Sequence, residues 1–229
     1  MTTKRQIQAL AAPLLARNPD LALVGPYSIW FQPTGSIVRE IIVNRTSDPD
    51  RFQLQWHLTE CFLPEGYDGG AFGRCSSIIY RTDTWREVWR WSDPAMADDF
   101  VVCCERDVIP VLRPLDTDRK RLEFARDRRE SWNRYGWTWY LMTEIALGNL
   151  DDARAIWLRN RAFYEAGHVF ACGRSQKTYD RYRQIGPPLL AKDREALKNL
   201  LRTWIAENAV DSRHAVSWMR EPLPIEEIT

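Results

Sequence analysis

Apolar residues near the N-terminus recur every three or four positions, which is the spacing of an amphipathic helix. Pro13 lies inside this pattern and is expected to bend or shorten the helix, and Asn18-Pro19-Asp20 is expected to end it. The positions predicted to face the core are Ile7, Leu10, Ala11, Leu14 and Leu15.

The spacing then changes to that of strands. β-Branched and aromatic residues fill 27–32 and 37–44, and Pro33-Thr34-Gly35 between them is typical of a hairpin turn. Residues 52–59 alternate between apolar and polar side chains, which predicts a strand with one buried and one solvent-exposed face. Two further strands are predicted at 76–81 and 85–91, and short strands that follow one another favour an antiparallel sheet.

Helical spacing dominates the rest of the chain. Ser92-Asp93-Pro94 is a typical helix start, and Pro110 and Pro114 are expected to end that helix. Residues 173–185 have no assigned structure, and Gly186-Pro187-Pro188 predicts a break. Further helices are predicted at 118–134, 137–147, 150–165 and 193–206, of which the second and third form a hairpin around Gly148-Asn149.

These patterns predict an α+β fold. An antiparallel sheet of four or five strands, covered by helices, is expected in residues 1–115. An α-helical region is expected in 116–220, packed on the first part, and residues 221–229 are expected to form a mobile tail.

Composition and charge narrow the classes of function. The chain has 229 residues and a formal net charge of +1, so no overall field favours nucleic acid or an anionic membrane. No apolar run approaches the ~18 residues of a membrane span, and no secretory signal is recognised. Five cysteines, odd in number and irregularly spaced, argue against a disulfide framework or a zinc site and favour reduced thiols in the cytoplasm.

Eleven tryptophans are the most distinctive feature of the composition. Within 85–91 aromatic and charged residues alternate, so the tryptophans are either packed under a helix or exposed beside arginines as an interface surface. The glycine-rich segment 66–73 lacks a phosphate-binding motif but offers two aromatic contacts. The candidate partner-binding residues are therefore Trp85, Arg86, Trp89, Arg90, Trp91, Tyr67 and Phe72.

No catalytic, cofactor or metal motif is recognised. His57 and Cys61 are four residues apart on a predicted strand, about 13 Å, which is too far for a nucleophile pair. His168 and Cys172 form a single pair, which is not a metal site. No catalytic residue, cofactor or metal is therefore predicted.

Two other classes of function stay open. One is an enzyme or small-molecule-binding protein with a site on the polar sheet face around Gln55, His57 and Glu65. The other is nucleic-acid binding through the basic stretches 119–121, 126–129 and 174–183, with Tyr179 and Tyr182 stacking on bases. Acidic residues interspersed in these stretches oppose this second class.

Two parts of the chain resemble known families. The 137–157 hairpin resembles one tetratricopeptide unit in the placing of Trp137, Gly148, Ala153 and Trp157, but Leu141 and Glu165 depart from the pattern. No second copy follows at the ~34-residue period of such arrays.

The first ~100 residues resemble small bacterial domains of unknown function, on a helix, the strand Tyr27-Ser28-Ile29-Trp30-Phe31, a second strand at 36–43 and a third that runs into Phe62-Leu63-Pro64. Such domains occur among toxin-immunity and other interaction proteins, and the resemblance carries over no functional residue. Together with the aromatic richness, the absence of catalytic motifs and the reduced cysteines, this resemblance predicts a cytoplasmic, non-enzymatic protein, of immunity or adaptor type, that binds another protein. No membrane partner is expected.

Overall fold

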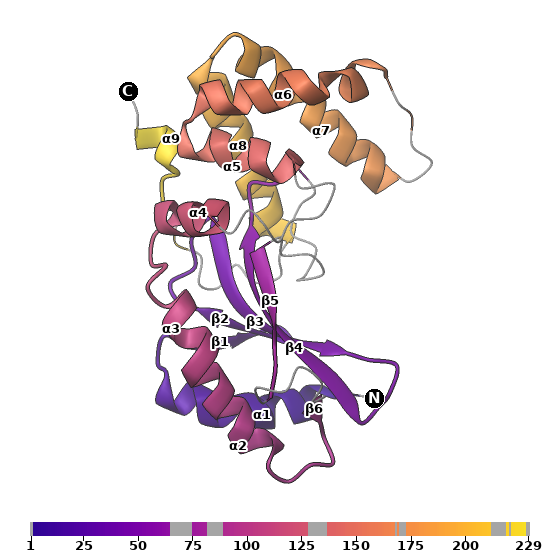
Figure 1. Ribbon diagram of the computed structural model, residues 1–229, viewed down its shortest axis with the longest axis vertical. Helices are drawn as coiled ribbons and strands as arrows, with labels where there is room; N and C mark the ends of the chain where they lie inside the picture. The colour runs from indigo at the N-terminus through magenta and orange to yellow at the C-terminus, as the bar shows by residue number, and fades with distance from the viewer. Residues whose placement is uncertain are drawn as a thin grey trace. The chain divides into compact units, whose positions relative to one another are not determined.

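The computed structural model of the protein describes residues 2–64, 75–81, 89–127, 137–167, 169, 173–211, 219 and 221–227. It confirms the α+β class (Figure 1). The chain divides into two compact units. Unit 1 comprises Met1–Thr59, Gly70–Asp116 and Arg213–Met219, and unit 2 comprises Glu60–Gly69, Thr117–Ser212 and Arg220–Thr229. The chain passes between the units several times, which a single boundary near residue 115 does not describe.

The sheet belongs to unit 1 and has six strands among the described residues. Five follow one another in the order β1-β2-β3-β4-β5, and β6 also pairs with β4. The short apolar strand β1 was not predicted, which explains the expected count of four or five. The strands are β1 (Leu21–Val24), β2 (Ser28–Phe31), β3 (Ile37–Arg45), β4 (Arg51–Glu60), β5 (Cys75–Ile79) and β6 (Trp89–Arg90).

The antiparallel registers decide which side chains share a face. Trp30 lies opposite Glu40 between β2 and β3, and His57 lies opposite Ser76 between β4 and β5. Phe52 lies opposite Trp89 between β4 and β6. Because alternate residues of a strand face the same side, Gln55, His57 and Thr59 share one face of β4.

Helix α1 (Lys4–Arg17) begins with a capping box, in which Thr3 Oγ1 accepts from the Gln6 backbone and Gln6 Oε1 accepts from the Thr3 backbone. Of the two effects expected of Pro13, bending or shortening, shortening does not occur, because the helix continues to Arg17. Ile7, Leu10, Ala11 and Leu14 are buried as predicted, whereas Leu15 is only half-buried, and this burial outweighs one missing backbone hydrogen bond. Asn18 ends the helix, as expected, and its backbone N–H bonds to the Leu14 carbonyl.

A second long helical segment of unit 1 consists of α2 (Met96–Cys103), the π-helical turn η1 (Cys104–Val108) and α3 (Ile109–Leu112). The expectation that Pro110 ends the helix is wrong, because helical structure continues to Leu112. Proline cannot donate a backbone hydrogen bond, and its ring crowds the carbonyl one turn earlier. The wider π turn directly before it relieves that crowding and keeps Phe100, Cys104 and Leu112 in the core.

Unit 2 is helical, and the predicted hairpin around Gly148 is confirmed with both its helix ranges. The expected break at 186–188 is wrong, because α7 runs through both prolines. The expected mobile tail is also wrong, since Leu223, Pro224 and Ile225 are buried. The helices are α4 (Asp118–Asp127), α5 (Trp137–Leu147), α6 (Leu150–Glu165), α7 (Gly173–Leu190), α8 (Arg194–Asp211) and α9 (Pro224–Glu227).

Residues 60–64 belong to unit 2 because helices of that unit bond to them. Trp139 Nε1 donates to Glu60 Oε1 at 3.0 Å, and Arg181 Nη1 donates to the Pro64 carbonyl at 3.0 Å. Asn208 Nδ2 donates to the Leu63 carbonyl at 3.2 Å. Within unit 2, residues 60–64 are thus held by α5, α7 and α8.

Aromatic rings fill the space between α6 and α7. The rings of Trp157 and Tyr164 stack with centroids 5.3 Å apart, and Tyr179 and Tyr182 lie within 5.6 Å of Tyr164. Gly186 of α7 faces Trp157 so closely that an added Cβ would lie 2.5 Å from Trp157 Cζ2. The ring packing therefore depends on a residue without a side chain at position 186.

Replacing Gly186 with alanine is expected to destabilise the protein by about 1–3 kcal/mol, because the new methyl group overfills the contact with Trp157. Urea unfolding followed by tryptophan fluorescence measures the change. Trp157→Phe removes the indole atoms that lie nearest Gly186, so in this background the same replacement should cost clearly less. An equal cost in both backgrounds would show that the contact is not the cause.

Within the described residues, no helix has the length and apolar character needed to cross a membrane.

Candidate functional site

Among the described residues, β5 is the last strand of the sheet on its side of β4. β5 pairs with β4 on one side, and no described strand pairs with its other side. Ser76, Ser77 and Ile78 are all exposed, although successive residues of a strand point to opposite faces. An edge strand presents unpaired backbone N–H and C=O groups that can hydrogen bond to another chain. Both faces of β5 are therefore accessible beside such an edge.

The chemistry of this edge is unusual, because residues 75–80 read Cys-Ser-Ser-Ile-Ile-Tyr and contain no charge and no proline. Sheets commonly protect their edges from other chains with charged side chains or proline. The alternating exposed side chains Ile78 and Tyr80, 37% and 36% accessible, add an apolar contact on one face. The edge is thus suited to pairing with an extended chain.

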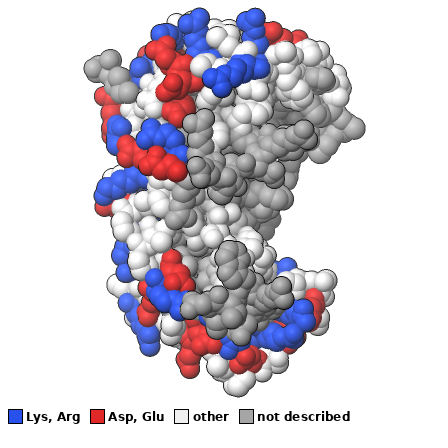
Figure 2. Space-filling view, in the orientation of Figure 1, with Lys and Arg blue, Asp and Glu red and all other residues white. Residues whose placement is uncertain are grey.

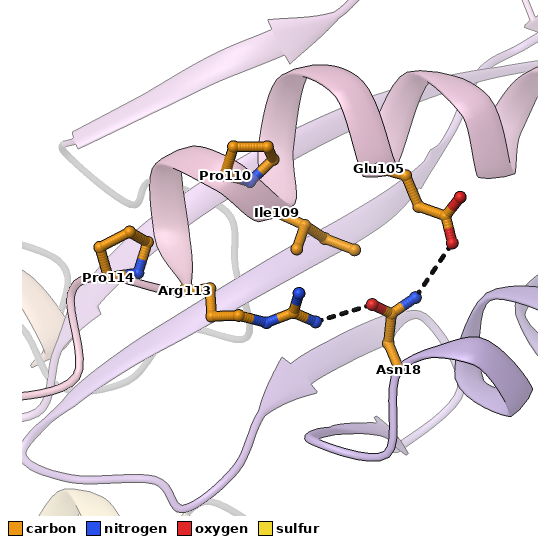
Figure 3. A pocket seen from close by; sticks show the side chains of 6 residues that line it. All are labelled: Asn18, Glu105, Ile109, Pro110, Arg113 and Pro114. Carbon is orange, nitrogen blue, oxygen red and sulfur yellow. Dashed lines mark hydrogen bonds between the residues drawn. The ribbon is translucent and has the colours of Figure 1, made fainter.

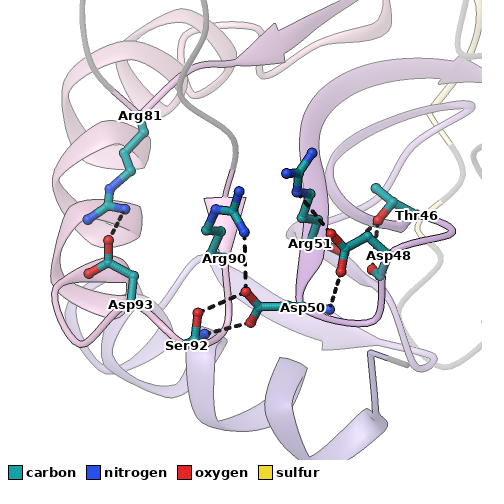
Figure 4. A network of polar contacts seen from close by, with 8 residues as sticks. All are labelled: Thr46, Asp48, Asp50, Arg51, Arg81, Arg90, Ser92 and Asp93. Atoms are coloured by element: carbon teal, nitrogen blue, oxygen red, sulfur yellow. Dashed lines mark hydrogen bonds and ion pairs between the residues drawn. The ribbon is translucent and has the colours of Figure 1, made fainter.

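Arg81 follows this run directly, and its guanidinium faces the carboxylate of Asp93 (Figure 4). Its guanidinium lies 2.5 Å from Asp93 and 2.7 Å from Asp99, and only 11% of the side chain is exposed. Hydrogen bonds to Asp93 and Asp99 raise the pKa of Arg81, and the pKa of Asp93 is lowered in return. Ion pairing therefore engages the charge of Arg81, whereas Arg74, which precedes the run, lies outside the described residues.

The neighbouring strand β6 carries Arg90 opposite Arg51 of β4. Carboxylates from the loop before β4 neutralise this pair, with Asp48 3.0 Å from Arg51 and Asp50 3.5 Å from Arg90 (Figure 4). Ser92 donates two hydrogen bonds to Asp50, which together with Arg90 lower the pKa of its carboxyl group. Local ion pairs and hydrogen bonds thus connect β6 with the loop before β4, and Arg90 remains exposed.

The candidate anchors in this region have different environments. Trp89 is 2% exposed, packs near Phe52 and Phe100 and donates its Nε1–H to the Ile79 carbonyl at 2.8 Å. Its expected role as a surface anchor is therefore wrong, because it belongs to the core. Trp91 is half-buried, since it stacks on Phe52 at 4.2 Å and donates to Thr2.

The other proposed anchors, Tyr67, Phe72, Trp85 and Arg86, lie outside the described residues. In sequence, the first pair precedes β5 and the second pair follows it. The open edge itself was not recognised from the sequence. Its signal was the uncharged run at 75–80, but only the sheet order shows that this strand lies at an edge.

The polar face around His57 differs from the expectation. His57 is 2% exposed, its Nε2 lies 3.0 Å from Gln55 Oε1, and Asn44 donates to the same oxygen. Burial lowers the pKa of His57 to about 4, so the ring is uncharged at neutral pH. The expected solvent exposure is wrong here, because alternation shows which residues share a face but not whether that face is covered.

A second pair of contacts lies on the same face, where Trp30 Nε1 and Thr59 Oγ1 donate to the buried carboxylate of Glu40 at 3.0 and 2.8 Å. These polar side chains hydrogen bond to one another in the interior. Glu65, the third residue of the expected site, lies outside the described residues.

The four described cysteines are buried, and none of them forms a disulfide. Burial raises the pKa of Cys103 and of Cys104, so both stay protonated, and protonated thiols are poor nucleophiles and metal ligands. Among the described residues, no group of three or more His, Cys, Asp and Glu side chains could hold a metal ion.

The basic stretches of unit 2 are largely paired internally. Arg121 is buried beside Asp118, Arg119 pairs with Glu227, and Arg181 pairs with Glu207. The expectation that Tyr179 and Tyr182 stack on bases is wrong, because both rings are buried. Figure 2 shows basic and acidic side chains interspersed on the face it presents, without a field of one sign.

Comparison with protein-family models, with curated proteins and with solved structures found no match to the chain. The two resemblances drawn from the sequence stay predictions. A function has to be argued from the surfaces that the chain itself presents.

Proposed function

We propose that the protein binds another protein, and that an extended segment of this partner adds to the sheet as a further strand at β5. The main support for this proposal is the uncharged edge strand, which is exposed on both faces and has no described strand beyond it. In this mode of recognition, backbone hydrogen bonds supply affinity, and alternate side chains of the added strand supply specificity.

The side chains around the edge indicate the chemistry of the partner segment. Ile78 and Tyr80 favour an apolar residue on one face of the added strand. Ser76 and Ser77 offer hydroxyl groups that can donate or accept, one on each face. Because no charge lies between Cys75 and Tyr80, the central residues of the segment are expected to be uncharged as well.

Residues next to the edge extend the proposed interface. β6 pairs with the part of β4 that precedes the part paired with β5, so Arg90 and the half-buried Trp91 continue the surface. Tyr67, Phe72, Trp85 and Arg86 lie in the segments that flank β5 in sequence, and we include them in the interface. Aromatic residues and arginine are enriched among interface hot spots.

The environments of the reactive side chains favour binding over catalysis. The His57 ring is enclosed and uncharged, and the Cys103 and Cys104 thiols stay protonated. Holding a partner at one-to-one stoichiometry requires a folded surface only. A cytoplasmic protein of the immunity or adaptor type, which acts by occupying its partner, fits this description.

A pair of matched variants tests the proposal. Ile78→Lys places a charge on the open edge, whereas Val102→Lys places the same charge on an exposed apolar position of α2, which is 53% accessible. Tagged wild-type protein is expected to retain a stoichiometric partner from its native host, identified by mass spectrometry. Ile78→Lys should weaken this retention about tenfold or more, since edge charges block strand addition, and Val102→Lys should keep it.

Both variants must first show the circular dichroism and melting temperature of the wild type. A partner retained equally by wild type and Ile78→Lys would contradict binding at β5. The absence of any stoichiometric partner would contradict the protein-binding proposal itself.

A further inference from the structure

A surface hollow of about 320 Å³ lies in unit 1 beside the π-helical turn (Figure 3). It lies between Asn18, at the end of α1, and one side of the η1–α3 segment. Its wall is apolar and is formed by Ile109, Pro110 and Pro114, while Glu105 and Arg113 stand at its two ends. A small hollow with an apolar wall and a few convergent polar groups is typical of a ligand site.

Hydrogen bonds and ion pairs hold the polar side chains of this hollow in place. Asn18, only 6% exposed, donates its Nδ2 to Glu105 Oε1 at 3.3 Å and accepts at Oδ1 from Arg113 Nη2 at 2.7 Å. Arg113 also holds Asp20 through two hydrogen bonds of 2.9 Å, and Arg17 holds Glu105 at 3.2 Å. The hydrogen bond from Arg113 lowers the pKa of Asp20, and that of Arg113 is raised, so the charges are permanent.

Hydrogen-bonding capacity remains at both ends. Arg113 uses its Nε and Nη2 for these bonds, and its Nη1 has no hydrogen-bond partner among the described residues. Each Glu105 oxygen accepts one bond, although a carboxylate oxygen can accept two. The Asn18 amide directs its N–H toward Glu105 and its C=O toward Arg113. A ligand between these ends would likewise place its hydrogen-bond donor at Glu105 and its acceptor at Arg113.

We propose that this hollow binds a free α-amino acid with an apolar side chain. The carboxylate accepts from Arg113 Nη1, the ammonium group donates to Glu105, and the side chain covers Ile109, Pro110 and Pro114. A zwitterionic head group matches both charged ends, whereas a ligand with one charge leaves the other end unmatched. The volume is at the lower limit of ligand pockets, about 300–1,000 Å³, which suits an amino acid rather than a nucleotide. None of the residues that line this hollow belongs to β5.

Isothermal titration of the full-length protein with three related probes tests the zwitterion. L-Leucine is expected to bind saturably at one site. L-Leucinamide, which lacks the carboxylate, and N-acetyl-L-leucine, which lacks the ammonium group, should each bind about tenfold more weakly or worse, since each loses a charge-assisted hydrogen bond. Equal binding of the three probes would overturn the proposal. So would the absence of saturable binding by leucine, isoleucine, valine and methionine at up to about 10 mM.

Two variants on the same turn locate the site. Glu105→Gln removes the charge that holds the ammonium group, and Asp107→Asn removes a carboxylate that pairs with Arg106 and does not line the hollow. Glu105→Gln should weaken leucine binding about tenfold while leaving that of N-acetyl-L-leucine unchanged, and Asp107→Asn should bind as the wild type does. Unchanged leucine binding by Glu105→Gln would place the ligand elsewhere and contradict the proposal.

Discussion

Replacing Arg121 with methionine is expected to lower the free energy of unfolding by about 3–5 kcal/mol. Arg121 Nη1 lies 2.6 Å from Asp118 Oδ1 within α4, and both side chains are only 1% exposed. Methionine fills much of the space of the arginine stem but removes the cation that pairs with the buried Asp118 carboxylate and, at 3.7 Å, with Glu221. The desolvation of that charge is then poorly compensated, which is the physical source of the loss.

Two further variants separate this effect from a general disturbance of α4. Arg119→Met removes an ion pair with Glu227 whose partners are about half exposed, so it should cost less than about 1 kcal/mol. Adding Asp118→Leu to Arg121→Met removes the buried carboxylate as well as its cation and should recover part of the stability. If Arg121→Met costs no more than Arg119→Met in urea unfolding, the buried pair is not a major source of stability.

Lowering the pH from 7 to 4 is expected to cost about 3 kcal/mol of stability through His57 alone. Burial lowers the pKa of His57 from 6.5 to about 4 in the folded protein. Below pH 6.5 the unfolded chain takes up a proton that the folded protein does not bind, so protonation favours unfolding. This loss grows until the pH reaches about 4, where the folded protein binds the proton as well.

The comparison of wild type with His57→Gln isolates this effect. Glutamine keeps a polar group that can contact Gln55 but does not titrate, so the variant should show a flatter dependence of stability on pH between 6.5 and 4.5. Carboxyl groups such as Asp20, whose pKa is lowered, lose their contribution at lower pH and do so in both proteins. Urea unfolding at several pH values gives the two slopes, and identical slopes would show that His57 takes up its proton without hindrance.

Periodicity predicted well those elements that depend on local spacing. The α5–α6 hairpin was predicted with its bounds, because helical spacing on both sides of Gly148-Asn149 agrees with the turn chemistry. Proline-based boundaries failed at Pro110 and at Pro187-Pro188. There the burial of Leu112 and Leu189 outweighs the missing backbone hydrogen bonds, and burial depends on contacts distant in sequence.

The candidate site could be predicted only in part, for the same reason. The order of polar residues in β4 showed that Gln55 and His57 share a face, but not that His57 is buried. The alternation at 85–91 allowed Trp89 to be either core or exposed, and its contact with Phe52 decides for the core. The uncharged run at 75–80 is visible in the sequence, yet its meaning depends on the order of strands in the sheet.

Hydrogen exchange of the backbone amides tests the central claim most directly, with the captured partner present and absent. Strand addition at β5 predicts slower exchange within residues 75–80 on binding, because outward N–H groups of the edge become hydrogen bonded. Protection confined to other segments, with exchange in residues 75–80 unchanged, would contradict the account.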